Sequence, residues 1–115
     1  GGDRDRGKRP LMGEIASRLS DYLFLTSDNP RNEDPDEILS EIVSGISGKR
    51  YEVIPDRREA ITRAIEKAGP GDIVLIAGKG HEDYQEIKGV RYLFRDKEVA
   101  DEAIKKRIVK SNREQ

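Results

Sequence analysis

Apolar residues recur along the chain at the three- and four-residue spacing of helices that bury one face. Three of these stretches follow a capping residue, because Asp34, Asp56 and Asp96 stand where a carboxylate accepts the first backbone N–H groups of a helix. The remaining stretch begins at Pro10, whose missing N–H group does not weaken a first helical turn. The predicted helices cover about residues 10–21, 34–48, 56–68 and 96–109.

Short apolar runs between the helices predict strands. Residues 22–27 and 51–54 combine aromatic and branched side chains. Residues 73–77, with the sequence IVLIA, show no polar alternation and therefore predict a central parallel strand covered on both faces. Two further runs flank Lys88-Gly89 and predict a β-hairpin with a tight turn. This alternation of helices and strands predicts an α/β fold with right-handed crossovers.

The composition narrows the class of protein. A length of 115 residues favours one folded domain over residues 1–115. The chain has 22 Lys and Arg against 23 Asp and Glu, so it lacks the basic excess of a general nucleic-acid binder. It has no cysteine and one histidine, which argues against a zinc centre, and we expect no bound metal. No apolar run approaches the ~20 residues that cross a bilayer, so we expect no membrane partner and a cytoplasmic location.

The first nine residues, GGDRDRGKR, are typical of a loop that follows a strand, although no strand precedes them in the sequence. We therefore expect the chain to be a fragment of a longer protein. In open α/β sheets a ligand binds beyond the carboxyl ends of the parallel strands. Residues 1–9, 28–31 and 78–82 occupy such positions and are expected to open at one edge.

These three loops carry both signs of charge. Arginine binds carboxylates with paired N–H groups and acidic side chains accept the protons of an ammonium group, so a zwitterionic ligand such as an amino acid would suit them. Gly78 and Gly80 would let backbone amide groups approach it closely. The cations are Arg4, Arg6, Lys8, Arg9, Arg31 and Lys79, and the anions are Asp3, Asp5, Asp28 and Glu82.

Each loop also has a simpler interpretation. Residues 1–9 could form only a flexible arm, and residues 28–31 an ordinary Asx turn. The string GKGHE lacks the spacing of a Walker phosphate loop. Its single histidine has no neighbouring nucleophile, so no catalytic set is visible.

Three segments in order resemble the C-terminal domain of the Mur ligases, namely GGDRDRGKRPLMGEIA at 1–16, TSDNPRNEDP at 26–35 and IAGKGHEDYQ at 76–85. The string DNPR resembles the mark of members that add meso-diaminopimelate instead of lysine. The resemblance implies a three-layer Rossmann-like fold, with a mostly parallel sheet, helices on both faces and a C-terminal hairpin. It also implies an ATP-dependent amide ligase of peptidoglycan synthesis, which joins diaminopimelate to UDP-N-acetylmuramoyl-L-alanyl-D-glutamate through an acyl phosphate.

The resemblance also implies a set of residues that contact diaminopimelate. Arg31 would clamp the distal carboxylate, and Arg4 would hold the other carboxylate. Asp28 or Asn29, together with Glu82, would bind the distal ammonium group. The full set implied by the family is Arg4, Asp28, Asn29, Pro30, Arg31, Gly78 and Glu82.

Other parts of such a ligase are missing from this sequence. Asp3 and Lys8 lie where related ligases approach the nucleotide, but the chain has no Walker loop, no carbamylated-lysine segment for Mg and no uridine-binding domain. ATP and Mg are therefore expected to bind mainly to other domains. The isolated chain would contain no catalytic residue and would be inactive alone.

Two other functions stay open. One is a related Mur ligase that adds L-lysine, which the arginine at position 31 disfavours. The other is a stand-alone amino-acid-binding module without a ligase partner. A nucleic-acid role for the basic arm would require salt-dependent binding to oligonucleotides, and the balanced charge disfavours it.

Overall fold

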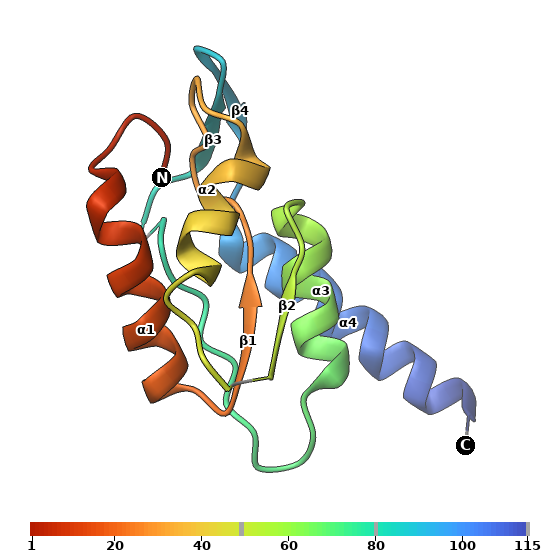
Figure 1. The fold of residues 1–115 in the computed structure, drawn as a ribbon. Helices are drawn as coiled ribbons and strands as arrows, with labels where there is room; N and C mark the ends of the chain where they lie inside the picture. The colour runs from red at the N-terminus through yellow and green to blue at the C-terminus, as the bar shows by residue number, and fades with distance from the viewer. Residues whose placement is uncertain (49, 80, 115) are drawn as a thin grey trace.

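The computed structural model describes residues 1–48, 50–79 and 81–114 (Figure 1). Helices and short strands alternate along it, and all four predicted helices are present. The elements are η1 (Arg6–Lys8), α1 (Arg9–Leu19), β1 (Tyr22–Leu25), α2 (Pro35–Val43), β2 (Arg50–Val53), α3 (Arg57–Lys67), β3 (Tyr84–Ile87), β4 (Val90–Leu93) and α4 (Asp96–Glu114).

Local sequence explains where two of the helices begin. The Asp34 carboxylate caps α2 by accepting the backbone N–H two residues on at 2.9 Å. The Asp56 carboxylate caps α3 by accepting the N–H three residues on at 3.1 Å. Each such cap stabilises a helix by about 1 kcal/mol. Asp96 differs, because it is the first residue of α4 and its carboxylate binds Arg57, so the predicted capping role is wrong there.

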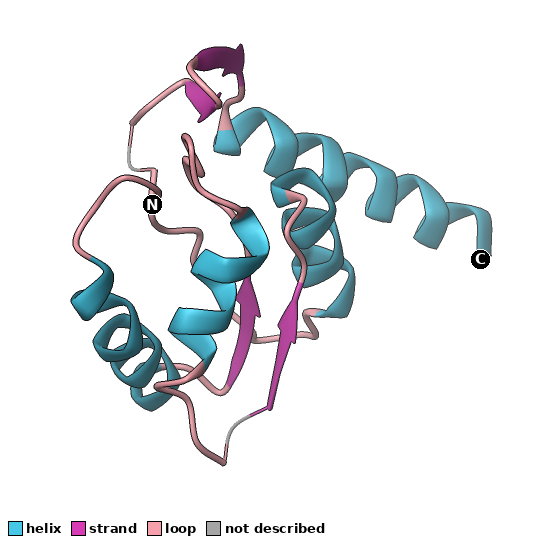
Figure 2. Cartoon of the chain, turned by 45° about the horizontal axis from the view of Figure 1, so that its top comes forward, coloured by secondary structure: helices cyan, strands magenta, loops and turns pink. Residues whose placement is uncertain are grey.

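β1 and β2 form a parallel pair with Leu25 opposite Val53. β1 contacts both α1 and α3, while α1 packs on α2 and α3 packs on α4 (Figure 2). Apolar side chains of α3 and α4 meet in one cluster, where burial of each large side chain contributes about 1.5–3 kcal/mol. The buried apolar residues are Leu25, Ile38, Leu39, Ile54, Ala60, Ile61, Ile65, Val99 and Ala103.

Residues 73–77 do not form the central strand that their sequence predicts. Figure 1 shows the segment on the side of β1 away from β2, but no described strand pairs with it. Ile73 is 93% exposed and Leu75 is 86% exposed. The prediction was wrong because an apolar sequence becomes a strand only where a neighbouring backbone supplies ladder hydrogen bonds.

β3 and β4 form the predicted antiparallel hairpin. Lys88 and Gly89 have φ values of 49° and 78°, and positive φ at both central residues is what a type I′ hairpin turn requires. The hairpin is a sheet of its own, joined to the loop after β1 by a parallel bridge between Arg31 and Ile87. It therefore stands beside the carboxyl end of β1 (Figure 1).

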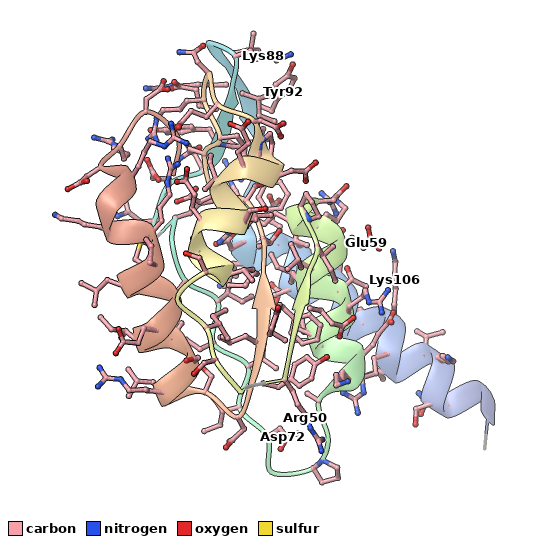
Figure 3. The ribbon with its side chains drawn as sticks, in the orientation of Figure 1. Arg50, Glu59, Asp72, Lys88, Tyr92 and Lys106 are labelled. Atoms are coloured by element: carbon pink, nitrogen blue, oxygen red, sulfur yellow. The ribbon has the colours of Figure 1, made fainter. Side chains whose placement is uncertain are left out.

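α4 extends away from the rest of the molecule toward the C-terminus (Figure 1). It continues to Glu114 and is therefore longer than predicted. Charged side chains cover much of its surface, as Lys106 illustrates in Figure 3. Neither α4 nor any other helix in the described part of the chain is long and apolar enough to span a membrane.

Candidate functional site

The three predicted loops meet beyond the carboxyl end of β1. The Gly2 N–H group donates to the Asn29 carbonyl at 2.7 Å, which joins the first loop to the second. The Asn29 side chain donates to Glu82 Oε1 at 3.2 Å, which joins the second loop to the third. We call this meeting point the strand-end rim, and it comprises residues 1–3, 28–31, 78–79 and 81–82. Gly80, expected to approach a ligand, lies outside the described residues.

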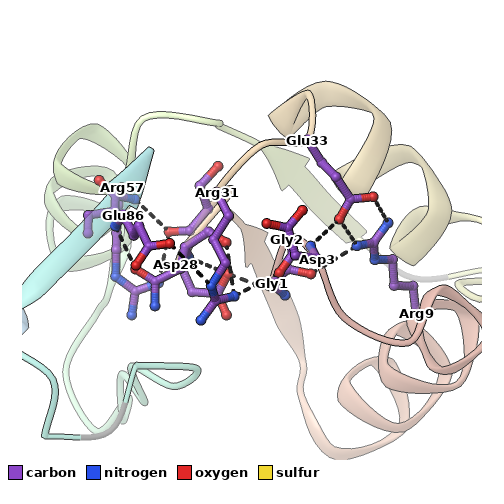
Figure 4. A network of polar contacts seen from close by, with 12 residues as sticks. Gly1, Gly2, Asp3, Arg9, Asp28, Arg31, Glu33, Arg57 and Glu86 are labelled. Atoms are coloured by element: carbon purple, nitrogen blue, oxygen red, sulfur yellow. Dashed lines mark hydrogen bonds and ion pairs between the residues drawn. The ribbon is translucent and has the colours of Figure 1, made fainter. Parts of the chain in front are cut away.

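Arg31 has an unusual backbone conformation. Its φ of 54° lies in the left-handed region, which costs a residue with a side chain roughly 1–2 kcal/mol. Two bonds to the hairpin hold it there, since its N–H donates to the Glu86 carbonyl at 2.9 Å and its carbonyl accepts from Lys88 N–H at 2.6 Å. Nη1 donates to the Gly2 carbonyl at 2.8 Å (Figure 4). The backbone therefore directs the guanidinium toward the first loop.

Glycines allow the loops to approach closely. A Cβ on Gly2 would lie 1.7 Å from the Pro30 carbonyl oxygen, so no other residue fits without moving backbone. Gly78 has φ of 108°, and a Cβ there would lie 3.7 Å from the Asp28 Cβ. Asp28 is thus close to both flanking loops, as predicted.

Asn29 is 2% exposed, and both ends of its side-chain amide are used inside the protein. Its Oδ1 accepts from Glu86 N–H at 2.8 Å while its Nδ2 donates to Glu82. The other Glu82 oxygen accepts from the Tyr84 hydroxyl at 2.9 Å, and this hydrogen bond raises the pKa of Tyr84. Asn29 therefore holds Glu82 in place.

Lys79 was expected to be a cation of the ligand site, and this expectation is wrong. The side chain is 3% exposed. Its Nζ donates to the carbonyls of Glu82 at 3.1 Å and Phe94 at 3.2 Å, and also to that of Tyr84. Burial lowers its pKa. Lys79 therefore holds the third loop, at residues 78–79 and 81–82, against the hairpin formed by β3 and β4.

Arg9, also expected to face the ligand, is 2% exposed and faces inward. It donates to Glu41 Oε2 and to Glu33 Oε2 at 2.7 Å each, and to the Gly1 carbonyl at 2.9 Å. Arg6 binds the same Glu41 carboxylate. Hydrogen bonds from Arg6 and then Arg9 lower the pKa of Glu41 to about 2. The two arginines therefore hold the first loop against α2.

Arg57 was missed in the sequence. It is 3% exposed and donates from Nε and Nη2 to the Asp96 carboxylate at 2.8 and 2.7 Å. It also donates to the carbonyls of Ser27 at 3.1 Å and Ala77 at 3.0 Å. The sequence held one signal, because Arg57 lies in the first turn of α3. The helix dipole disfavours a cation at that position, so its presence indicates another interaction.

The outer residues of the predicted site are less constrained. Arg4 and Lys8 are exposed. The Asp3 backbone N–H donates to Glu33 Oε2 at 2.5 Å, and its carboxylate accepts from Asn32 at 3.0 Å. The predicted residues that the structure brings together are Asp28, Asn29, Pro30, Arg31, Gly78 and Glu82.

Two open hollows lie away from the rim, one beside α4 around Val109 and one around Arg63. Within residues 1–48, 50–79 and 81–114, no three His, Asp or Glu side chains are placed to hold a metal ion.

The parallel pair of β1 and β2 with helices packed on it makes this an α/β domain, and its charged loops converge where domains of this class commonly bind ligands. A family model described as "Mur ligase, glutamate ligase domain" matches residues 1–80. The chain belongs to this family, which confirms the resemblance seen in the sequence.

Several curated relatives cover most of the chain. The chain is 60% identical over 104 residues to a protein from Nitrosomonas europaea and 58% identical over 101 residues to one from Chlorobaculum tepidum. Both relatives are named UDP-N-acetylmuramoyl-L-alanyl-D-glutamate--2,6-diaminopimelate ligase. The matches cover 90% and 88% of this chain but only 20% of each relative. The chain therefore spans about a fifth of the length of these relatives.

A solved structure of a ligase with the same name confirms the predicted α/β fold class. The two chains are 56% identical, and they superpose with a TM-score of 0.87. The match covers 91% of this chain and 22% of the other.

Proposed function

We propose that this chain is the amino-acid-binding part of a longer ATP-dependent ligase. The enzyme would add meso-diaminopimelate to UDP-N-acetylmuramoyl-L-alanyl-D-glutamate in the cytoplasm, during peptidoglycan synthesis. The observation that carries the proposal is the meeting of Arg31, Asp28 and Glu82 at one rim, with backbone bonds holding each loop in place. The names of the relatives supply the substrate class.

In this proposal, Arg31 binds the distal carboxylate of diaminopimelate. Nη1 already donates to Gly2, but a guanidinium carries five N–H groups, so donors remain for a carboxylate. Asp28 and Glu82 accept the distal ammonium group. Asn29 acts through Glu82, because its own amide is engaged at both ends.

The first loop and the remaining domains would complete the reaction. Arg4 is exposed on the first loop and would hold the carboxylate next to the reacting amine. Asp3 and Lys8, also exposed, would approach the nucleotide. We assign ATP and Mg mainly to the rest of the enzyme, because the sequence contains no Walker phosphate loop. This chain would orient the amine that attacks an acyl phosphate formed there, and alone it would be inactive.

Selectivity against lysine follows from Arg31. Lysine has no distal carboxylate, so in its complex the Arg31 guanidinium, 16% exposed, would keep only its pair with Glu86, 3.9 Å from Nε, and its bond to the Gly2 carbonyl. Loss of a hydrogen bond to a charged group costs about 1.5–3 kcal/mol, or about 10- to 160-fold in affinity. A ligase that adds lysine is therefore the weaker alternative.

Arg31→Ala in the full-length ligase that carries this chain tests the proposal. We expect loss of most diaminopimelate-dependent phosphate release, by about 30-fold or more, with ATP binding retained. The matched control is Arg58→Ala, which removes an exposed arginine paired with Glu102 and should leave turnover unchanged. Unchanged turnover in Arg31→Ala would refute the clamp.

A binding experiment separates the remaining alternatives. Titration of the 115-residue chain with meso-diaminopimelate and with lysine, followed by NMR, should shift the rim resonances with diaminopimelate at lower concentration. A preference for lysine would favour the lysine-adding ligase. Binding without any activity in the full-length protein would favour a stand-alone module.

A further inference from the structure

Arg57 joins three parts of the molecule directly beneath the strand-end rim. Its guanidinium contacts the carbonyl of Ser27, the carbonyl of Ala77 and the carboxylate of Asp96. Ser27 immediately precedes Asp28, and Ala77 immediately precedes Gly78. One side chain therefore holds the backbone one residue before each of two proposed ligand-binding loops.

The Arg57 guanidinium links two backbone segments that no β-ladder joins in the described part of the chain. In the described part of the chain no ladder hydrogen bonds join residues 72–77 to β1. Nη1 and Nη2 are the two ends of one rigid planar fork, so their bonds to Ser27 and Ala77 fix the spacing of the two backbones. Asp96 fixes the fork itself through two bonds, and it is anchored at the start of α4.

Arg57 lies behind the rim instead of on it. Nη1 is 4.0 Å from the position that a Cβ on Gly78 would occupy, and the side chain is 3% exposed. Its donors face backbone and Asp96, so it would act on a ligand only by placing the loops. Gln85 adds a second bond to the Ser27 carbonyl at 3.2 Å but does not reach the Ala77 side.

We infer that Arg57 is a positioning residue, which sets the separation between Asp28 and the Gly78–Glu82 loop and thereby the selectivity for diaminopimelate. The inference rests on the proposed function of the rim. Diaminopimelate is gripped at its distal end by groups from both loops, so their separation must match one ligand length. A misplacement of about 1 Å in such a site can lower kcat/KM by about 100-fold.

Arg57→Lys in the full-length ligase tests this inference. The substitution keeps the charge but removes the fork. We expect the KM for diaminopimelate to rise about 10- to 100-fold, with the KM for ATP unchanged and kcat within about threefold. The ratio of kcat/KM for diaminopimelate to that for lysine should fall by about the same factor. Arg63→Lys, on the same helix and paired with Glu52 at the surface, is the matched control.

Four outcomes would overturn either the inference about Arg57 or the proposed function, and they can be told apart. An unchanged KM for diaminopimelate in Arg57→Lys would overturn the inference. A fall in kcat alone, or an equal rise in both KM values, would also overturn it, because a purely structural role lowers the amount of folded enzyme or affects both substrates. A wild-type ligase that does not use diaminopimelate would instead overturn the proposed function.

Asp96→Asn provides a second variant should Arg57→Lys fail to fold. It retains the shape of the Asp96 side chain and leaves the Arg57 guanidinium in place, without its anionic partner. We expect a rise in the KM for diaminopimelate of about 10-fold, again with the KM for ATP unchanged. Equal KM values in wild type and Asp96→Asn would overturn the inference.

Discussion

Arg9 and Arg57 are buried to the same extent, at 2% and 3% exposure, but their partners differ. Arg9 binds two carboxylates, Glu33 and Glu41, whose side chains are 22% and 28% exposed. Arg57 binds one carboxylate, Asp96, which is 17% exposed, and two backbone carbonyls. The Ser27 partner of Arg57 is buried, at 9% exposure, whereas both carboxylates bound to Arg9 are partly exposed.

This difference suggests that the burial of an arginine does not by itself determine how much stability is lost when the arginine is removed. An exposed carboxylate that loses an arginine can bind water or another cation, and Glu41 also has Arg6. The Asp96 carboxylate has no second arginine among the described residues, and an acceptor left unsatisfied in a partly buried site costs about 1–3 kcal/mol. We therefore expect the two arginines to respond differently to the same substitution.

Arg57→Ala should have the largest effect on stability. It leaves the Asp96 carboxylate and the Ala77 carbonyl without this donor, and the Ser27 carbonyl with Gln85 alone, so we expect the free energy of unfolding to fall by about 2–5 kcal/mol. Chemical denaturation of the 115-residue chain measures this as a lower midpoint at constant slope. Arg63→Ala, which removes a surface pair, should change it by about 1 kcal/mol or less. A loss no larger than that of the control would mean that the Arg57 contacts contribute no more stability than a surface ion pair.

Arg9→Ala should have a smaller effect, with the free energy of unfolding falling by about 1–3 kcal/mol. The more specific consequence is local, because the Gly1 carbonyl loses its donor and the first loop is released. Hydrogen exchange of the Gly2 N–H, which donates to Asn29, should become faster in Arg9→Ala. Arg6→Ala, which removes the other donor to Glu41, is the control and should leave that exchange rate close to wild type. Equal protection of Gly2 in all three proteins would show that Arg9 does not hold the loop.

The sequence predicts the elements that depend on nearby residues. The helix that Asp34 caps and the hairpin turn at Lys88-Gly89 are both present, because capping and turn geometry involve residues only two or three positions apart. The meeting of the three loops was predicted as well, although in the described structure only the loop at residues 28–31 follows a strand, β1.

The sequence does not predict features that depend on distant partners. Residues 73–77 and β1 have similar apolar sequences, but only β1 has a paired neighbour in the described structure. Lys79 and Arg57 are charged and therefore suggest surface or ligand contacts, whereas both bind internal carbonyls. Such partners are brought together only by the tertiary fold, so no spacing rule reveals them.

The pH dependence of stability provides the most specific test of the contacts that Arg9 makes with Glu33 and Glu41, and its expected effect is the smallest. Hydrogen bonds from Arg6 and Arg9 lower the pKa of Glu41 from 4.5 to about 2, and that of Glu33 is lowered chiefly by Arg9. A carboxylate with a lowered pKa in the folded state stabilises the protein above its unfolded pKa and loses this contribution as the pH falls through its folded pKa. The contribution of Glu41 should therefore be complete above about pH 4.5 and disappear by about pH 2.

Glu41→Gln removes this titration and keeps the shape of the side chain. The wild-type protein should be more stable than Glu41→Gln at pH 7, and the difference in denaturation midpoint should shrink toward zero between about pH 4.5 and 2. Glu102→Gln, which removes a carboxylate paired at the surface with Arg58, is the matched control. The difference in denaturation midpoint between this variant and wild type should change less over the same pH range. A difference between wild type and Glu41→Gln that stays constant down to pH 2 would mean that the Glu41 carboxylate is not held by the two arginines. The stability that Arg9 provides would then come from packing and from its bond to the Gly1 carbonyl, and not from the Glu41 carboxylate that it shares with Arg6.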